Sequence, residues 1–332
     1  MHFVVVVVTW NGERWIAECL DSIESQETVP DLVVVDNGST DGTVKIAESR
    51  RAAIEKRGAR LEVLRLDTNT GFVAGANRGL KIVIGDLDPA DGVLLLNQDA
   101  ALEPGCLAAF ADALDRHPRA GALGAKILYP DDGLIQHAGG YLERPRMVGL
   151  HHGHHDPERT GEFDQELEVE FVTGAAMMLR TTAIAEVGVF NEIFSPGYYE
   201  DVDLCDRLRA GGWSVLFVPS ARVTHPESSS FSDRALRLRI ANRNRYIYVL
   251  PQFSDSAFGE DFLAAERAHL EQNATYDEIR AASGAALDVL ARLPDLVHLR
   301  PIARGRADRV CATARQVLTE VRSICNRMLR AR

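Results

Sequence analysis

Residues 3–11 have the sequence Phe-Val-Val-Val-Val-Val-Thr-Trp-Asn. Five consecutive valines disfavour a helix and favour a strand that is buried on both faces, as the strands of parallel sheets are. The hydrophobic period then changes, because Ile16, Cys19, Leu20 and Ile23 recur at the spacing of one helix face. A buried strand followed by an amphipathic helix indicates the start of a βαβ unit.

The same alternation continues to about residue 120. Further strands are predicted at residues 32–35, 61–66 and 93–96, and helices near 43–56 and 74–84. Right-handed crossovers between such strands give a mainly parallel sheet that helices cover on both faces. We therefore expect an α/β fold whose ligands bind beyond the carboxyl ends of the strands.

After residue 120 the pattern is mixed. Strands are predicted at residues 122–129, 169–178 and 213–218, and a Gly- and His-rich stretch at 139–161 separates the first two. From about residue 232 onward the chain has helical periodicity. For 332 residues we expect one catalytic domain and a helical extension, with a boundary near residue 255.

Composition excludes several classes of protein. The net charge of −11 and the pI near 5.4 argue against a nucleic-acid partner, because phosphate backbones are bound by clustered Lys and Arg. The five cysteines include no C-x-x-C pair, so they predict neither a disulfide framework nor a zinc site. The apolar run at residues 3–8 is too short to span a bilayer and lacks the features of a secretory signal. We expect a cytoplasmic protein.

Polar residues follow three of the predicted strands. They are Thr9-Trp10-Asn11, Asp36-Asn37-Gly38-Ser39 and Asn97-Gln98-Asp99, and residues 200–206 add four carboxylates at the expected start of a helix. Because parallel strands end at one edge of a sheet, these clusters predict a single site. Asp36 either belongs to a strand-to-helix turn or accepts a hydrogen bond from a nucleobase N–H, since a buried carboxylate needs a partner.

The ordered set of these motifs resembles glycosyltransferase family 2. The resemblance covers roughly residues 3–230, and it is the order of the motifs, not any single one, that is specific. The segments that carry it are Thr9-Trp10-Asn11, Asp36 to Asp41, Asn69-Thr70-Gly71-Phe72, Gly75 to Gly79, Leu96 to Asp99, Thr173-Gly174-Ala175, Glu200 to Leu204, Gly211-Gly212-Trp213 and His225.

The resemblance implies a GT-A fold, which is a Rossmann-like, mainly parallel mixed sheet flanked by helices. It also implies a nucleotide-diphosphate sugar donor, a divalent cation and inversion at the anomeric carbon. The catalytic domain, 1–254, would contain a nucleotide-sugar-binding half, 1–120, and an acceptor-side half, 121–254, followed by a C-terminal helical extension, 255–332. By analogy the donor would be bound by Thr9, Asn11, Asp36, Asn37, Gly71, Asn77 and Asn97.

The cation, Mg²⁺ or Mn²⁺, would be bound by Asp99 and by His225, which matches the family's histidine. Carboxylate and phosphate oxygens suit both ions, whereas imidazole favours Mn²⁺. The family pattern is usually Asp-x-Asp, so Asn97 is a departure that leaves one carboxylate in place of two. The alternatives are that Asp99 caps the next helix and that His225 is a structural hydrogen-bonding group.

Asp201 is the expected general base, because an inverting transfer needs one carboxylate to accept the proton of the attacking hydroxyl. The alternative for this acidic run is a capped and solvated helix start. Small side chains after the strand near residue 173 would let a sugar approach the backbone, although they could equally serve packing. On the acceptor side we expect Gly174, Ala175, Glu200 and Trp213.

The expected donor is dTDP-rhamnose, because the Asn-x-Asp form of the metal motif resembles that of bacterial rhamnosyltransferases. A UDP-hexose is the alternative. A sugar-phosphate nucleotidylyltransferase would have a Gly-rich loop with Arg and Lys after the first strand, which residues 10–13 do not supply. A silent nucleotide-sugar-binding module is a third alternative. By resemblance to enzymes of cell-wall or polysaccharide synthesis, the acceptor would be a carbohydrate, a lipid-linked sugar or another hydroxyl compound.

Two further segments have alternative interpretations. Residues 151–155, His-His-Gly-His-His, are expected to form a solvated loop, because a zinc site needs a closed set of ligands. Residues 300–332 contain nine arginines and an apolar stripe at helical spacing, which predicts an amphipathic helix with a basic face. We expect the stripe to pack on the catalytic domain or a second subunit. Contact with anionic lipid at the inner face of the cell membrane is the alternative.

Overall fold

The structure is a computed structural model of the 332-residue chain, and it describes residues 1–85, 90–158, 161–226, 233–300, 302 and 305–331. The chain forms two compact units. The first comprises Met1–Tyr141, Leu150–Pro196 and Glu200–Ser228, and the second comprises Leu142–Gly149, Gly197–Tyr199 and Ser229–Arg332. The expected division between residues 254 and 255 stays a prediction about function, because compactness alone does not define a catalytic domain.

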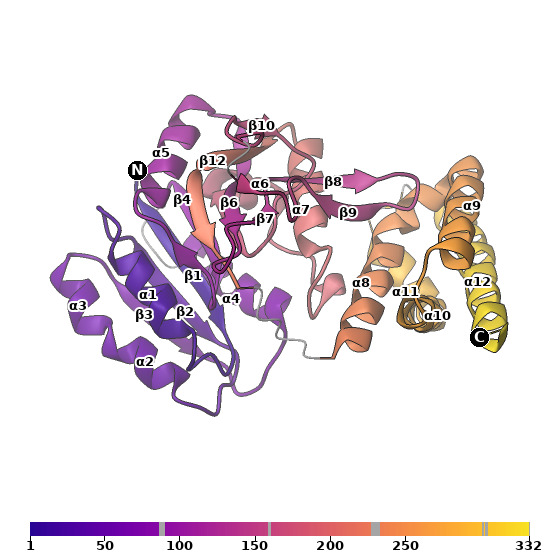
Figure 1. Ribbon diagram of the computed structural model, residues 1–332, viewed down its shortest axis with the longest axis horizontal. Helices are drawn as coiled ribbons and strands as arrows, with labels where there is room; N and C mark the ends of the chain where they lie inside the picture. The colour runs from indigo at the N-terminus through magenta and orange to yellow at the C-terminus, as the bar shows by residue number, and fades with distance from the viewer. Residues whose placement is uncertain (86–89, 159–160, 227–232, 301, 303–304, 332) are drawn as a thin grey trace. The chain divides into compact units, whose positions relative to one another are not determined.

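A mixed sheet forms the centre of the first unit (Figure 1). Its strands are β1 (Phe3–Thr9), β2 (Asp31–Asp36), β3 (Leu61–Arg65), β4 (Gly92–Asn97), β5 (Ala101–Leu102), β6 (Ala120–Leu128), β7 (Ile135–His137), β10 (Leu167–Glu168), β11 (Ala176–Arg180) and β12 (Ser214–Thr224). Their order is β10-β12-β6-β11-β4-β1-β2-β3, with β5 beside β12 and β7 beside β6. The neighbours β4, β1, β2 and β3 are parallel, as predicted, whereas β11 is antiparallel to both β4 and β6.

Helices cover this sheet, and most of them lie where the sequence predicts them. α4 packs on β1 and β2, α5 and α7 pack on β12, and α6 packs on β11. The helices of the first unit are α1 (Ile16–Glu24), α2 (Thr43–Ser49), α3 (Arg51–Lys56), α4 (Phe72–Gly85), α5 (Cys106–Arg116), α6 (Thr181–Val187), the short η2 (Glu192–Phe194) and α7 (Glu200–Ala210).

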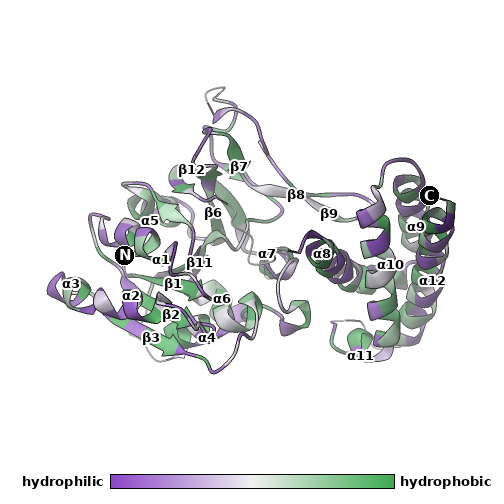
Figure 2. Cartoon of the chain, turned by 60° about the horizontal axis from the view of Figure 1, so that its bottom comes forward, coloured by the Kyte–Doolittle hydropathy of each residue, from purple (hydrophilic) through white to green (hydrophobic). Residues whose placement is uncertain are grey.

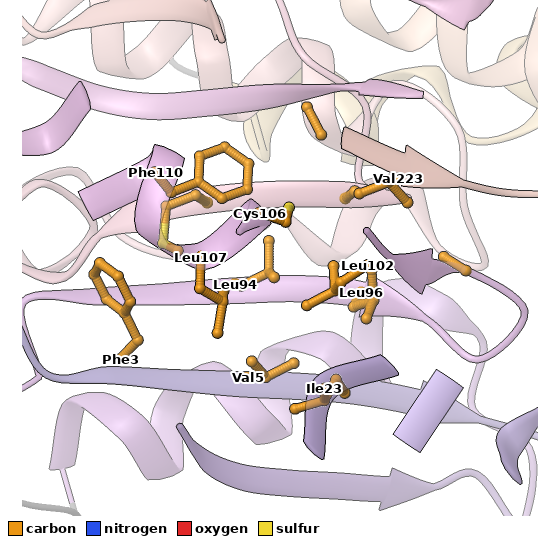
Figure 3. Close-up of a cluster of buried hydrophobic side chains, with 14 of the residues drawn as sticks. Phe3, Val5, Ile23, Leu94, Leu96, Leu102, Cys106, Leu107, Phe110 and Val223 are labelled. Atoms are coloured by element: carbon orange, nitrogen blue, oxygen red, sulfur yellow. The ribbon is translucent and has the colours of Figure 1, made fainter. Parts of the chain in front are cut away.

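Strand β1 is buried on both faces, which explains its run of valines. Val5 belongs to a hydrophobic cluster with Ile23 of α1 and Phe110 of α5 (Figure 3). On the other face Val6 lies against α4, where a Cβ built on Gly79 would come within 2.3 Å of Val6 Cγ1. Because successive strand residues point to opposite faces, each face of β1 needs its own helical cover.

Two predicted elements, one strand and one helix, do not extend over the whole of their expected ranges. The strand expected at 169–178 begins only at Ala176, where β11 lies between β4 and β6, and the preceding strand β10 ends at Glu168 beside β12. One strand cannot pair at both places, so the chain between them crosses from one position to the other. The helix expected at 43–56 is interrupted at Arg50, which separates α2 from α3. Within the Gly- and His-rich stretch, β8 (Gly140–Glu143) and β9 (Val148–His151) pair with each other.

Helices make up most of the second unit. They are α8 (Arg234–Val249), η3 (Leu250–Ser254), α9 (Ser256–Gln272), α10 (Tyr276–Ala291), α11 (Leu293–His298) and α12 (Ala307–Ala331). The apolar stripe of α12 is buried, and α12 packs on α9, α10, α11 and η3 within this unit. Hydrophobic and hydrophilic residues both occur along α12, the buried ones at helical spacing (Figure 2). Each helix among the described residues is too short or too polar to traverse a lipid bilayer.

A buried ionic network centred on Glu266 of α9 holds the second unit together. Its carboxylate accepts hydrogen bonds from Arg245 (2.5 and 3.0 Å), Arg146 (3.0 Å) and the Tyr246 hydroxyl (2.8 Å). Burial opposes ionisation, but the two arginines outweigh it and lower the pKa of Glu266 to about 2. Arg146 thereby ties residues 142–149 to the C-terminal helices.

Asn244 of α8 holds the segment 197–199 in the same unit. Its Nδ2 donates to the carbonyl oxygens of Gly197 (2.8 Å) and Tyr198 (2.9 Å). Tyr198 and Tyr199 have φ values of 72° and 71°, a left-handed conformation that bulky residues rarely adopt. The Tyr199 hydroxyl donates to the carbonyl of Met147 (2.7 Å), so the three segments of the second unit are joined by side-chain hydrogen bonds.

Candidate active site

The carboxyl ends of three strands are level at one edge of the sheet. Thr9 of β1 is aligned with Asp36 of β2, and Val8 of β1 is aligned with Asn97 of β4. The backbone N–H of Asn97 also donates to the carbonyl of Ala175, which precedes β11 (3.0 Å). The polar clusters that the sequence predicted to meet therefore do meet.

Gln98 joins two of these strand ends. The Thr9 hydroxyl donates to Gln98 Oε1 (2.5 Å), and the backbone N–H of Trp10 donates to the same oxygen (3.0 Å). In return, Gln98 Nε2 donates to the carbonyl of Trp10 (3.3 Å). No role was predicted for Gln98, and the structure shows that its amide engages the hydroxyl of Thr9.

The loop after β2 is organised by Asp36 and Asn11. The buried Asp36 carboxylate accepts hydrogen bonds from the backbone N–H of Ser39 (3.2 and 3.3 Å). Asn11 Oδ1 accepts from the backbone N–H of Thr40 (2.9 Å), and the N–H of Asn11 donates to Ser39 Oγ (2.8 Å). The turn interpretation of Asp36 is therefore correct. Because a carboxylate can accept about four hydrogen bonds, the turn leaves acceptor capacity for a ligand.

Asn37 and Gly71 shape the loop beside Asp36. Asn37 Nδ2 donates to the carbonyl of Gly71 (3.0 Å), and its Oδ1 accepts from the N–H and the hydroxyl of Thr70 (both 2.9 Å). Gly71 has a φ of 86°, and a Cβ there would approach Pro196 Cβ to 2.7 Å. If Asn37 and Gly71 contribute to donor binding, they do so by shaping this loop.

Asp99 and His225 lie in contact although 126 residues separate them. His225 Nε2 is 3.2 Å from Asp99 Oδ1 and 3.4 Å from Asn97 Nδ2. Both side chains of the pair are only 7% exposed. On the other side of the imidazole ring, Nδ1 is 2.8 Å from Oε1 of Gln136 in β7.

This pair fits a divalent cation. A carboxylate oxygen and an imidazole nitrogen at this separation can bind one ion, and the combination suits Mn²⁺. The contact between Nδ1 and Gln136 is of the kind that metal-ligating histidines make with their other ring nitrogen. Among the described residues no three His, Cys, Asp or Glu side chains gather as a metal site. The remaining ligands would therefore be phosphate oxygens or water.

Glu200 and Asp201 are the first two residues of α7. Asp201 accepts hydrogen bonds from the backbone N–H groups of Val202 (2.8 Å) and Gly174 (3.4 Å). Burial raises the pKa of Asp201 to about 6, even though these two N–H groups lower it in part. A carboxylate of this pKa is suited to accept a proton at neutral pH.

The pKa of Glu200 is also raised by its surroundings. Burial, followed by the charge of Asp201, raises the pKa of Glu200 well above its usual range. Its Oε2 is buried and has no hydrogen-bond partner among the described residues. Two adjacent acids in one buried place cannot both ionise readily, so burial and the charge of Asp201 favour the protonated form of Glu200.

A continuous series of contacts connects the acid pair with the proposed cation site. Asp201 contacts the N–H of Gly174, and the carbonyl of the next residue, Ala175, accepts from the N–H of Asn97. The Asn97 side chain in turn contacts His225. Gly174 and Ala175 therefore lie between the general base candidate and the metal-ligand candidates.

Asn77 does not join this group of contacts. Its Nδ2 donates to the carbonyl of Phe190 (2.9 Å) and lies 3.4 Å from Glu192 Oε1, so it links α4 to the segment before η2. Its Oδ1 is buried and has no partner among the described residues. A direct donor contact by Asn77 stays a prediction.

Trp213 lies away from the other predicted residues, which corrects the expected acceptor-side position. It precedes Ser214, the first residue of β12, whereas His225 follows the last residue of that strand. Its Nε1 donates to Glu186 Oε2 (3.2 Å), and the guanidinium of Arg119 lies 4.2 Å from its ring centroid. Trp213 therefore has a packing role at the opposite end of β12.

The solvated loop expected at residues 151–155 is solvated in part, because His154 and His155 are exposed whereas His151 ends β9 and contacts the buried His137. His137 of β7 is buried, and its Nδ1 is 2.9 Å from Nδ1 of His151 in β9. Burial, followed by the neighbouring histidines, lowers the pKa of His137 well below its usual range. His154 Nδ1 lies 3.2 Å from the carbonyl of Gln136, so these rings surround the residue that contacts His225.

Comparison with known sequences identifies the family of the chain. The profile of Glycosyl transferase family 2 matches residues 4–188. The chain is 32% identical over 270 residues to N-acetylglucosaminyl-diphospho-decaprenol L-rhamnosyltransferase of Mycobacterium tuberculosis, which is 75% of this chain and 84% of that protein. It is 34% identical over 122 residues, 35% of this chain and 19% of the other, to poly(ribitol-phosphate) beta-N-acetylglucosaminyltransferase TarS of Staphylococcus aureus.

Solved structures have the same fold. S. aureus TarS 1–349 in complex with UDP-GlcNAc matches with a TM-score of 0.53 at 19% identity, over 97% of this chain and 92% of that chain. GalNAc-T7 with UDP, GalNAc and Mn²⁺ matches with a TM-score of 0.56 at 16% identity, over 79% of this chain and 54% of that chain.

The mixed sheet flanked by helices is the GT-A fold of these solved structures, and the family match makes the protein a glycosyltransferase. The chain belongs to glycosyl transferase family 2, and among the members of that family it resembles rhamnosyltransferases. The fold class and the family expected from the motifs are confirmed, and the nucleotidylyltransferase alternative is left without support.

Proposed function

We propose that the protein is an inverting, metal-dependent transferase that moves a sugar from a nucleotide-diphosphate donor to an acceptor hydroxyl. The observation that carries this proposal is the series of contacts that links Asp201 to His225 and Asp99. Such an arrangement offers a base for the acceptor and a binding place for the donor's phosphates, as in-line displacement requires.

Asp201 acts on the acceptor. Its carboxylate takes the proton of the attacking hydroxyl as that oxygen forms the new bond to the anomeric carbon. The bond from the anomeric carbon to the diphosphate breaks, and its electron pair leaves with the nucleoside diphosphate. The raised pKa of Glu200 favours its protonated form beside Asp201, which leaves Asp201 as the proton acceptor.

Asp99 and His225 hold the cation, for which their oxygen and nitrogen atoms favour Mn²⁺ over Mg²⁺. The bound ion supplies neutralisation of the charge that develops on the departing diphosphate. Asn97 lies 3.4 Å from His225 Nε2 and occupies the place of the family's first aspartate, so one protein carboxylate serves where two are usual. The protein therefore contributes fewer ligands to the cation, and oxygen atoms of the donor phosphates would supply further ligands.

The donor we propose is dTDP-rhamnose, with Asp36 accepting from the N–H of the base and with Asn11, Asn37 and Gly71 shaping the surrounding loops. The similarity to a rhamnosyltransferase over most of both chains supports this choice. A UDP-hexose is the second candidate, favoured by the fold shared with TarS, which is solved with UDP-GlcNAc. The name of the rhamnosyltransferase relative supports a lipid-linked diphospho-sugar as acceptor.

A nucleotide panel tests the donor site. We expect dTDP or UDP, but not GDP, to raise the melting temperature when Mn²⁺ is present, because a ligand that binds only the folded state stabilises it. Asp36→Ala should weaken the response to the preferred base, and Asp99→Ala should abolish the dependence on Mn²⁺. Equal responses to all three nucleotides would contradict the role of Asp36.

A transfer assay tests the reaction itself. Purified protein is given dTDP-rhamnose or UDP-GlcNAc with an N-acetylglucosaminyl-diphospho-polyprenol, and the product linkage is determined by NMR. We expect an anomeric configuration opposite to that of the donor, and transfer only with a divalent cation. Retention of configuration, or full activity in EDTA, would contradict the proposed mechanism.

We also propose that the second unit contacts an anionic membrane surface. That unit contains nineteen arginines against thirteen Asp and Glu, a net charge of +6, so the rest of the chain carries −17. A hollow of about 330 Å³ beside α10 and α12 is lined by Arg322, Arg327 and Arg330 together with polar residues. An anionic surface attracts one unit and repels the other, so it would orient the protein for a lipid-linked acceptor.

Vesicle binding tests this contact. We expect binding to phosphatidylglycerol vesicles but not to phosphatidylcholine vesicles, and weakening with salt. Replacing the three lining arginines by Gln should reduce binding about a hundredfold, given roughly 1 kcal/mol per cation near the surface. Replacing the exposed Lys45, Lys56 and Lys81 of the first unit by Gln is the matched control. Equal loss in both triple variants, or self-association in place of vesicle binding, would contradict a membrane role.

A further inference from the structure

Gln136 contacts His225 at two atoms. Its Nε2 donates to the backbone carbonyl of His225 (3.2 Å), and its Oε1 is 2.8 Å from His225 Nδ1. The side chain is buried, and β7 holds it in place by pairing with β6, which also pairs with the strand that ends before His225. This glutamine therefore has little freedom to choose another partner.

The two contacts together determine where the imidazole proton lies. A backbone carbonyl can only accept a hydrogen bond, so the amide nitrogen of Gln136 must face it. The amide oxygen then faces Nδ1, and because that oxygen cannot donate, Nδ1 must carry the proton. In the neutral imidazole the lone pair is left on Nε2, the atom that lies 3.2 Å from Asp99 Oδ1.

We propose that Gln136 is a positioning residue that fixes His225 as the Nδ1–H tautomer and thereby makes Nε2 available as a metal ligand. The inference rests on the metal role of His225 given under the proposed function. A free imidazole exchanges between its two tautomers, and only one of them presents a lone pair toward Asp99. Partners of this kind typically contribute 10- to 100-fold to metal affinity.

Two measurements on the full-length protein test this role. The affinity for Mn²⁺, followed by the EPR signal of the free ion, should fall about 10- to 100-fold in Gln136→Leu. In the metal-free protein labelled with ¹⁵N-histidine, the imidazole shifts of residue 225, assigned with His225→Asn, should indicate the Nδ1–H form. The same signal should move toward the Nε2–H form in Gln136→Leu.

Two further variants separate this role from general stability. Gln136→Glu keeps an acceptor for Nδ1–H, so it should retain most of the affinity for Mn²⁺. Gln26 is another buried glutamine, and its side chain bonds the backbone of Ser22, Glu103 and Leu107 in place of His225. Gln26→Leu should therefore cost stability without changing the affinity for Mn²⁺.

The outcomes that overturn the proposal are distinct from those that overturn the proposed function. An Nε2–H tautomer in the wild-type protein, or equal Mn²⁺ affinity in wild type and Gln136→Leu, would show that Gln136 has no such role. Equal losses in Gln136→Leu and Gln26→Leu would show the same. A wild-type protein that has the Nδ1–H form but binds no Mn²⁺, alone or with UDP or dTDP, would overturn the metal assignment itself.

Discussion

Burial of the Asp201 side chain disfavours its ionised form. Its pKa in the folded chain, about 6, lies above the ordinary value of 3.8. The stabilisation that its neutral form provides is therefore present below about pH 4 and is lost as the pH rises through about 6. An ionisable group whose pKa is shifted by its surroundings is typical of catalytic positions.

Asp201→Asn should separate activity from stability. We expect turnover to fall by about 10²- to 10⁴-fold, the usual contribution of a general base. The melting temperature at pH 7.5 should not fall, because a neutral amide removes the cost of a buried charge. Activity and thermal denaturation, measured on the same preparation, check both parts. A variant that keeps its activity, or one that unfolds, would contradict the assignment.

The pH profile of the wild-type enzyme provides the second check on this residue. We expect kcat/KM to fall below about pH 6, because the protonated carboxyl cannot accept the acceptor's proton. Glu200→Gln should leave this limb in place, since the raised pKa of Glu200 favours a neutral side chain, which glutamine resembles. A profile that is flat down to pH 4.5 would argue for another base.

At the scale of single residues, the sequence predicts the chemical groups better than it predicts their supports. Asp99, Asp201 and His225 belong to recognisable motifs; the first and last are in contact, and Asp201 is linked to them through intervening backbone and side-chain contacts. Gln136 belongs to no motif, because it lies in a three-residue strand whose partner in space is far along the chain. Contacts of this kind depend on the register of β7 against β6, which no local pattern records.

At the scale of elements, the close approach of α4 to β1 depends on a small residue. A Cβ on Gly79 would lie 2.3 Å from Val6 Cγ1 and 3.2 Å from Val35 Cγ2, both in central strands. Gly79→Ala should therefore lower the free energy of unfolding by about 1–3 kcal/mol, the usual cost of overpacking. Urea unfolding measures this difference.

Gly85 is the matched control in the same helix. Among the described residues, a Cβ there would meet no atom within 4 Å, so Gly85→Ala adds no clash with them. The better helix propensity of alanine should leave stability unchanged or raise it by up to about 1 kcal/mol. If both variants lost the same stability, the packing explanation of the Gly-rich motif at 75–79 would be wrong.

The sequence predicts best those elements that have the same neighbours and the same burial along their whole length. β1 is buried along nearly its whole length, and its valines indicate this directly. The chain at 169–178 is also apolar, yet its two ends join different neighbours, and hydrophobicity alone cannot show a crossing. The position expected for Trp213 differs from the observed one for a related reason. A motif identifies the residue but does not show at which end of the strand it lies.

At the scale of the whole molecule, the buried ionic network around Glu266 makes a large contribution to the stability of the second unit. Glu266→Gln leaves Arg245 buried beside a neutral partner, which should cost about 3–5 kcal/mol. The exposed pair of Glu320 and Arg267 is the control, and Glu320→Gln should cost less than about 1 kcal/mol. Chemical denaturation compares the two variants with the wild type.

The contribution of Glu266 also has a predictable dependence on pH. Its folded pKa, about 2, lies below the ordinary value of 4.5, so the stabilisation is fully present above about pH 4.5. It is lost as the pH falls toward about 2. The difference in stability between wild type and Glu266→Gln should therefore shrink in acid. A difference that stayed constant from pH 7 to pH 3 would contradict the ionic explanation.

The second unit is assembled from three separate stretches of chain, and this has a consequence for how such enzymes can be recombined. A chimaera made by one crossover near residue 233 would join foreign helices to the original residues 142–149 and 197–199. Arg146 would then lack Glu266, and the carbonyls of Gly197 and Tyr198 would lack Asn244. Exchange of this unit between relatives therefore requires that all three stretches be inherited as a set.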